Sequence, residues 1–344
     1  MSDNNIHRVA LFGAGRIGNV HSVNIHAHQE TEIAYVIDPY EEGAKKLAAS
    51  VGAKVGTTRQ AMEDTSVDGI VICSATNTHA DLIEQGIAAG KAVFCEKPVD
   101  LSLKRVDALL AKIAGKSDKL FVAFNRRFDP GIVAMHKRIT GGAIGDPELI
   151  TVISKDPGAP PADYIKVSGG LFRDMTIHDL DMARFLLGDE PVSVHATAST
   201  LTDPVIKTLD DFDTAIVTLQ TASGRMATIT NSRRASFGYD QRVEVHGSKG
   251  MLSTINMPET TLVQSDGTGV THEKPMHFFL ERYAQSYKNE WEHFVNVMNG
   301  EKKVLCSVED GRKALALAEA AYESVKTGRV VSISPHTKGT AALG

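Results

Sequence analysis

The sequence predicts a doubly wound α/β domain followed by an α+β domain with a large, open, mainly antiparallel sheet. Apolar runs typical of buried parallel strands alternate with helical stretches up to about Phe124. From Leu149 onward, apolar and polar residues alternate with a period of two, as in strands with one buried face. With 344 residues the chain is also too long for one typical core, which favours two domains.

The first domain begins with an apolar strand at residues 9–12 that runs directly into a glycine-rich turn. The turn has the G-x-G-x-x-G spacing that binds a pyrophosphate at a helix N-terminus. Gly13 allows the tight turn, Gly15 lets the backbone approach the pyrophosphate, and Gly18 permits close packing of helix on strand. Strand, turn and helix together predict an α/β Rossmann domain.

The second strand, residues 32–37, ends at Asp38. A carboxylate at the end of the second strand, about 20 residues after the glycine-rich turn, accepts hydrogen bonds from the adenosine ribose and would repel a 2′-phosphate. NAD is therefore the favoured cofactor. Lys45 and Lys46 lie further along and could meet a phosphate if the loop folded back.

Strands and helices continue to alternate up to residue 124, which places the first domain at residues 1–124. Helices are expected at 41–49, 59–62, 79–87 and 103–114, and strands at 54–55, 69–73, 92–95 and 120–124. Ligands of such sheets bind beyond the carboxyl ends of the strands. The residues expected to bind the cofactor there are Gly13, Gly15, Arg16, Ile17, Gly18, Asp38, Ser74, Ala75, Thr76, Asn77, His79, Glu96 and Lys97.

The second domain is expected at residues 125–334. Alternating strands are expected at 192–196, 214–219, 226–230 and 242–246, with helices near 173–187, 282–298 and 308–326. The tail, residues 335–344, is expected to be disordered.

Two further segments indicate redox chemistry on an alcohol. Lys97 follows a strand end and precedes Pro98, whose ring stiffens the loop and could adopt a cis bond. Asp174 and His178 are four apart in one predicted helix, so they share a face and pair with each other. An imidazole beside a carboxylate suits a general base for a hydroxyl proton. Asp181, one turn further on, is assigned to capping or a salt bridge.

Composition excludes several other classes of protein. The net charge of −5 argues against a nucleic-acid or anionic-membrane partner, and no apolar run is long enough to span a bilayer. The first five residues lack the charged start of a signal peptide, and the three cysteines are scattered, as expected of reduced thiols in the cytoplasm. Neither H-E-x-x-H nor a cysteine cluster is present, so no metal site is predicted.

The order of four segments resembles the Gfo/Idh/MocA superfamily, named after glucose–fructose oxidoreductase and inositol dehydrogenase. These segments are the glycine-rich turn, Ala92-Val-Phe-Cys-Glu-Lys-Pro98, Phe124-Asn-Arg-Arg-Phe-Asp129 and Asp174-x-x-x-His178-Asp179. Asn231-Ser-Arg-Arg-Ala and residues 237–250 are similar to its inositol-dehydrogenase branch. The likeness extends from Val9 to about Ile333.

The resemblance implies an NAD-dependent oxidation of myo-inositol to 2-keto-myo-inositol (scyllo-inosose), as in inositol catabolism. It implies Lys97, Asp174 and His178 as catalytic residues, with either Lys97 or His178 as the formal base. It implies substrate contacts from Asn125, Arg126, Asp156 and Tyr239. It also implies a late helix that packs back on the first domain, and a homotetramer formed through the open sheet faces.

Two other functions stay open. A dehydrogenase of another inositol isomer or of a pyranose sugar, with NAD or NADP, would keep the same chemistry. A non-catalytic regulator that senses NAD would not need Lys97, Asp174 and His178 all intact, so the sequence speaks against it.

Overall fold

The computed structural model describes residues 6–333 of the chain. It divides into two compact units, Met1–Val133 with Phe279–Leu315 and Ala134–Phe278 with Ala316–Gly344. The division falls inside α6 (Pro130–Thr140) and α12 (Val308–Thr327). The domain boundary after Phe124 stays a prediction, and the predicted tail at 335–344 lies outside the described residues.

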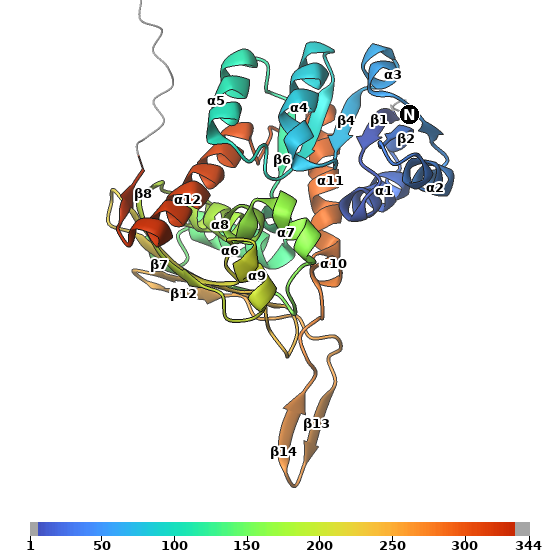
Figure 1. The fold of residues 1–344 in the computed structure, drawn as a ribbon. Helices are drawn as coiled ribbons and strands as arrows, with labels where there is room; N and C mark the ends of the chain where they lie inside the picture. Colours follow the sequence, from blue (N-terminus) through green and yellow to red (C-terminus); the bar gives the residue numbers. More distant parts are fainter. Residues whose placement is uncertain (1–5, 334–344) are drawn as a thin grey trace, which may run out of the picture. The chain divides into compact units, whose positions relative to one another are not determined.

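Unit 1 contains the predicted doubly wound sheet (Figure 1). Its strands, within the described residues, are β1 (His7–Phe12), β2 (Thr31–Ile37), β3 (Lys54–Val55), β4 (Gly69–Ile72), β5 (Ala92–Glu96) and β6 (Leu120–Ala123). All pair in parallel, in the order β3-β2-β1-β4-β5-β6. Every residue of β4, β5 and β6 is buried, which explains why these strands are apolar apart from Glu96 at the end of β5.

Helices cover both faces of this sheet, and the alternation along β5 decides which side chains meet which helix. The unit contains α1 (Arg16–Ala27), α2 (Glu41–Val51), α3 (Thr58–Glu63), α4 (His79–Ala88), α5 (Leu103–Lys112), α10 (Phe279–Arg282) and α11 (Ala284–Met298). Val93 lies close to Gly86 of α4. Phe94, on the opposite face, contacts His21 of α1 and both Trp291 and Phe294 of α11. The late segment 279–315 therefore belongs to the core of unit 1.

Unit 2 contains the predicted open sheet. Its strands are β7 (Pro147–Lys155), β8 (Pro191–Ser199), β9 (Thr214–Thr221), β10 (Met226–Ser232), β11 (Asp240–Gly247), β12 (Gly250–Ser253) and β15 (Val331–Ser332). They lie in the order β12-β11-β7-β10-β9-β8-β15. The pair β7–β10 is parallel and the other pairs are antiparallel, so the sheet is mixed but mainly antiparallel, as predicted.

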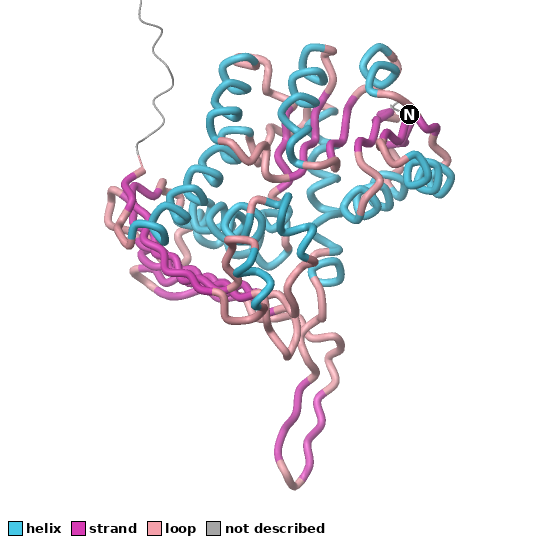
Figure 2. Tube along the Cα trace, in the orientation of Figure 1, coloured by secondary structure: helices cyan, strands magenta, loops and turns pink. Residues whose placement is uncertain are grey.

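Helices of unit 2 cover one face of its sheet (Figure 2). They include α7 (Ala162–Ser168), α8 (Ile177–Leu187) and α9 (Pro204–Thr208), together with the parts of α6 and α12 that belong to unit 2. Helix α8 packs against β7 and β10. The opposite face exposes large apolar side chains: Leu149, Ile216, Met226 and Met251. A hairpin of β13 (Val263–Asp266) and β14 (Gly269–His272) projects from the same unit (Figure 1). Within residues 6–333, none of the helices combines the length and the apolar character needed to cross a membrane.

Candidate active site

Four neighbouring parallel strands of unit 1 end at the same edge of the sheet. Phe12 of β1 pairs with Ile37 of β2 and with Ile72 of β4. Ile72 in turn pairs with Cys95 of β5. The residues that follow these ends are the predicted cofactor-binding set: Gly13, Gly15, Arg16, Ile17, Gly18, Asp38, Ser74, Ala75, Thr76, Asn77, His79, Glu96 and Lys97. The fold thus aligns the segments where open α/β sheets bind ligands.

The glycine-rich turn has the geometry that a pyrophosphate requires. Gly13 has a φ of +102°, and a Cβ there would collide with the carbonyl oxygen of Cys73. A Cβ on Gly18 would collide with the carbonyl oxygen of Gly13. Gly15, in contrast, has open space around its Cα, and as the N-cap of α1 it brings no capping side chain. The N-terminus of α1 therefore offers backbone N–H donors and its positive dipole end to an anion.

Asp38 is fixed by the backbone on both sides. Its Oδ2 accepts a hydrogen bond of 2.7 Å from the N–H of Ala14, and its Oδ1 one of 2.7 Å from the N–H of Tyr40. The carboxylate is thus held beside the glycine-rich turn, where a ribose would lie. The ammonium group of Lys45 pairs with Glu41 at 2.8 Å and with Glu42 at 3.5 Å. Its charge is therefore used within α2 rather than directed at a 2′-phosphate.

His79 links the loops that follow β4 and β5. Its Nδ1 lies 2.8 Å from the carbonyl oxygen of Pro98 and its Nε2 lies 3.0 Å from that of Ser74. Burial lowers the pKa of His79 and outweighs the two backbone contacts, which raise it. Ser74 Oγ also contacts Thr78 Oγ1 at 2.7 Å, at the end of the turn that carries Thr76 and Asn77. The imidazole therefore bridges the two loops, and in its neutral form it can donate to only one of these two carbonyl oxygens at a time.

The loop after β5 carries Lys97, which is half-buried, followed by a cis peptide bond to Pro98. Glu96 points to the face covered by α1, where its Oε1 lies 2.6 Å from Nε2 of His21. The carboxylate of Glu96 is thus engaged inside the unit, although its main chain lies at the strand end.

Asn125 and Arg126 lie in a short 3₁₀ turn, η2 (Asn125–Phe128), directly after β6. Both are buried, and the Arg126 guanidinium lies 5.6 Å from the centre of the Tyr283 ring. Arg127 pairs with Asp310 at 3.1 Å and donates to the carbonyl oxygen of Leu305. The guanidinium of Arg127 is therefore engaged in contacts within unit 1.

In unit 2, Asp174 and His178 lie on a helix that differs from the expected one. Residues Phe172–Thr176 (η3) form a π-helical turn, and α8 begins only at Ile177. Such wide turns occur frequently at functional sites. Asp174 accepts a 2.8 Å hydrogen bond from the Tyr164 hydroxyl on Oδ1, and Arg233 Nη2 lies 3.3 Å from Oδ2. His178 is half-buried.

A buried polar network anchors this helix to β10. Thr176 Oγ1 lies 2.7 Å from Asn231 Oδ1, and Asn231 Nδ2 donates to Asp179 Oδ2 at 2.7 Å. The side chain of Asp179 is fully buried. Asp181 forms the expected salt bridge, to Arg184 at 3.4 Å. The contacts of Tyr164, Arg233 and Asn231 were missed from the sequence, although Asn231-Ser-Arg-Arg had pointed to this segment.

Asp156 and Tyr239 lie at one edge of the sheet of unit 2. Lys155 of β7 pairs with both Asp240 of β11 and Ser232 of β10, so the residues flanking these pairs, including Asp156, Tyr239 and Arg233, lie at neighbouring strand ends. Tyr239 is buried and Asp156 half-buried. The pairing of β7 with β10 in unit 2 therefore brings Asp156 and Arg233 to neighbouring positions.

Two family models cover most of the chain. The model described as "Oxidoreductase family, NAD-binding Rossmann fold" matches residues 7–124, and "Oxidoreductase family, C-terminal alpha/beta domain" matches residues 136–333. The chain belongs to the Gfo/Idh/MocA oxidoreductase family. It is therefore an NAD-dependent oxidoreductase, as predicted from the glycine-rich turn and Asp38.

Similar proteins in this family carry the names of inositol dehydrogenases. Inositol 2-dehydrogenase of Rhizobium meliloti is 49% identical over 328 residues, covering 95% of this chain and 99% of that protein. The crystal structure of a myo-inositol dehydrogenase from Corynebacterium glutamicum is 43% identical with a TM-score of 0.92, over 96% of this chain and 99% of that one. A scyllo-inositol dehydrogenase from Lactobacillus casei, solved with NAD(H) and scyllo-inositol, is 28% identical with a TM-score of 0.87, over 95% and 99% of the two chains.

Proposed function

We propose that this enzyme oxidises the axial secondary alcohol of myo-inositol to 2-keto-myo-inositol (scyllo-inosose), in inositol catabolism. The observation that supports it most is the pair Asp174 and His178 in a Gfo/Idh/MocA chain, with Asp174 fixed by Tyr164 and Arg233. Relatives that are 43% and 49% identical over nearly the whole chain bear the name of this activity.

Three side chains would carry the chemistry of the protein. His178 takes the proton of the reacting hydroxyl, or shares that role with Lys97. Lys97 stabilises the developing alkoxide by its charge. Asp174 orients His178 and binds neighbouring hydroxyls. Bound NAD supplies the acceptor for the hydride that leaves the carbinol carbon.

Cofactor binding is proposed for the residues that follow the strand ends of unit 1. The N–H donors of Gly15, Arg16 and Ile17 at the start of α1 suit the pyrophosphate. Asp38 suits the ribose, since its carboxylate is already aimed by Ala14 and Tyr40. The remaining members of the set, from Ser74 to Lys97, would line the same edge.

Substrate recognition is proposed for Asn125, Arg126, Asp156 and Tyr239 together with Asp174. Amide, carboxylate and phenol groups read hydroxyls by hydrogen bonds. A site built in this way rejects compounds that leave its polar groups unpaired. Arg127 is committed to Asp310, so Arg126 is the cation of this turn that stays a candidate for substrate contact.

The second candidate is a dehydrogenase of another inositol isomer or of a pyranose. The relative solved with scyllo-inositol shows that the family accepts an inositol whose hydroxyls are arranged differently. A regulator that only senses NAD is the weaker alternative, because the sequence contains all three of Lys97, Asp174 and His178.

We also propose a homotetramer and a cytoplasmic location. The open face of the sheet in unit 2 exposes Leu149, Ile216, Met226 and Met251, which pairing a second sheet against it would bury. The three cysteines are buried and free, which suits a reducing compartment.

A substrate panel tests the activity. Initial rates of NADH formation would be compared for myo-inositol, scyllo-inositol, glucose and an inositol phosphate. The proposal expects myo-inositol to have the highest kcat/KM, because two carboxylates would repel a phosphate dianion. Another isomer or a hexose as the best substrate would favour the second candidate, and tight NAD binding without turnover on any polyol would favour the regulator.

A further inference from the structure

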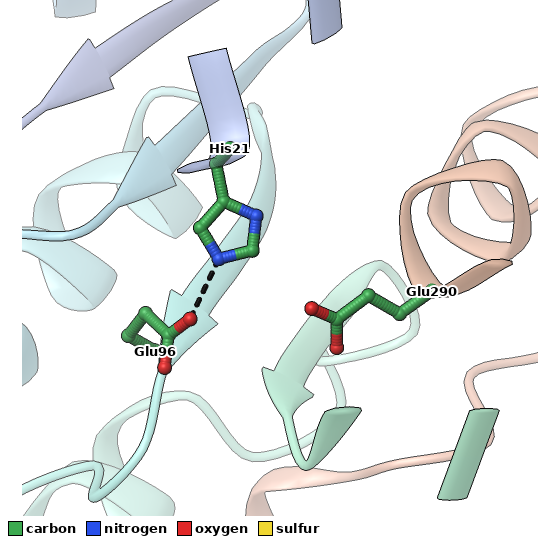
Figure 3. A group of neighbouring side chains, drawn as sticks. All are labelled: His21, Glu96 and Glu290. Carbon is green, nitrogen blue, oxygen red and sulfur yellow. Dashed lines mark hydrogen bonds and ion pairs between the residues drawn. The ribbon is translucent and has the colours of Figure 1, made fainter. Parts of the chain in front are cut away.

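Three buried side chains of unit 1 lie close together at the end of β5, next to the loop that carries Lys97 (Figure 3). His21 comes from α1, Glu96 from the end of β5 and Glu290 from α11. His21 Nε2 lies 2.6 Å from Glu96 Oε1, and one carboxylate oxygen of Glu290 lies within 4.8 Å of both groups. The picture shows the Glu290 carboxylate pointing toward the His21–Glu96 pair.

The surroundings of Glu290 offer its carboxylate no hydrogen bond. The residue is 0% exposed, and neither carboxylate oxygen has a partner within the described part of the chain. The titratable groups around it are His21 on α1, Glu96 on β5 and the Cys73 thiol after β4. Tyr287 on α11 packs its ring against His21. His21 is the only potential cation among these, and it is already bonded to Glu96.

An ionised Glu290 would be unfavourable in this setting. A buried charge without a partner is expelled or neutralised, and two carboxylates this close cannot both ionise easily. Burial, followed by the charge of Glu96, raises the pKa of Glu290 well above its ordinary value. The burial of Glu290 and its closeness to Glu96 point the same way, because protonation removes the charge of the Glu290 carboxylate.

We propose that Glu290 is a positioning residue held as a neutral carboxylic acid, and that its stored proton keeps the Glu96 carboxylate bonded to His21. Glu96 directly precedes Lys97, so the orientation of the Lys97 loop depends on this pair. An ionised Glu290 would repel Glu96 and release the loop. This inference deepens the proposed function, because it takes Lys97 as the group that must be positioned.

A metal ion is the other occupant that this donor set could hold. Two ligands of one tetrahedral zinc ion, each about 2.0 Å from the metal, lie roughly 3.3 Å apart. The 2.6 Å between His21 Nε2 and Glu96 Oε1 is shorter and matches a hydrogen bond. This distance therefore fits a hydrogen bond between His21 and Glu96 better than a metal ion shared by the two side chains.

The test compares Glu290→Gln, which keeps the shape and neutrality of the acid, with Glu290→Ala. Glu292→Gln is the matched control, because Glu292 lies on the same helix but is exposed and pairs with His28. Glu290→Gln and the control should keep kcat within about threefold of the wild type, whereas Glu290→Ala should lose kcat roughly 10- to 100-fold with a smaller change in KM. In the wild type kcat should fall as rising pH ionises Glu290, and this fall should vanish in Glu290→Gln.

Infrared difference spectroscopy checks the proton without any turnover. A band of a protonated carboxyl group should be present at neutral pH in the wild type and in Glu292→Gln, and absent in Glu290→Gln. Loss of kcat in Glu290→Gln equal to that in Glu290→Ala, no such band in the wild type, or a stoichiometric metal ion in the purified protein would each overturn the inference. Failure to oxidise polyols would instead contradict the proposed function and leave the infrared result informative.

Discussion

Arg233 Nη2 lies 3.3 Å from Asp174 Oδ2, and the arginine side chain is 1% exposed. The guanidinium comes from the end of β10 and the carboxylate from the π-helical turn before α8. A planar, buried cation fixes the direction of the carboxylate more firmly than a solvent-exposed lysine could. The pair therefore links the sheet of unit 2 to the residue proposed to orient His178.

Replacing Arg233 should lower activity by misplacing Asp174. We expect Arg233→Lys, which keeps the charge but loses the planar fork, to reduce kcat by about 10- to 100-fold. Arg234→Ala is the control, since Arg234 contacts the carbonyl oxygens of Thr202 and Leu201 and not Asp174. Steady-state kinetics together with a thermal unfolding curve would separate a loss of activity from a loss of stability. An unchanged kcat in a folded Arg233→Lys would show that Arg233 does not position Asp174.

Cofactor preference should depend on Asp38. Its carboxylate, held by the N–H groups of Ala14 and Tyr40, would face a 2′-phosphate with a like charge. The wild type should clearly prefer NAD, and Asp38→Ala should narrow the ratio of kcat/KM for NAD over NADP. Equal use of both cofactors by the wild type would refute this assignment.

Lys97→Ala and His178→Ala should each lose roughly two to four orders of magnitude in turnover, the usual range for an acid–base or charge-stabilising group. NAD should still bind, which a fluorescence titration would show. Near-normal turnover would remove the residue from the mechanism, and failure to fold would show that its role is structural.

The exposed face of the sheet in unit 2 should determine the oligomeric state. Met226 of β10 pairs with Leu149 of β7, and both are exposed on this face. Met226→Arg would place a charge where the proposed contact is apolar, and sedimentation should show smaller species for this variant than for the wild type, which we propose to be a tetramer. Val263→Arg, on the projecting hairpin, is the control for a charge on an exposed apolar site. A wild-type monomer would contradict the assembly.

The buried His79 should make stability depend on pH on the acid side. Its pKa is lowered by burial, so below the ordinary histidine value of 6.5 the unfolded chain binds a proton that the folded chain excludes. Stability is therefore complete above that value and is lost as the pH falls through it. His79→Gln should flatten this part of the curve in denaturant titrations, while His272→Gln, at an exposed site, should leave its slope unchanged.

The sequence predicted the positions that follow strand ends. Apolar runs and the glycine-rich turn place Gly13, Asp38, Ser74 and Glu96 at strand ends by local pattern alone, and parallel pairing aligns those ends. Asp174 and His178 were found because they are near neighbours in the chain.

Contacts between distant residues could not be predicted in this way. Arg233 is 59 positions from Asp174, and His21 is 75 positions from Glu96, so neither partner follows from spacing. Glu290 lies in a helix with ordinary amphipathic spacing, and only the fold shows that its side chain is buried. The π-helical turn at Phe172–Thr176 also depends on packing, which overrides a local helical pattern.

myo-Inositol labelled with deuterium on C2 tests the central claim most directly. If the enzyme oxidises the axial alcohol, the label must leave C2 with the hydride. Mass spectrometry should then find deuterium in the reduced nicotinamide and none in the ketone. Unlabelled NADH, with deuterium retained in the oxidised product, would show that another carbon reacts and would contradict the proposed activity.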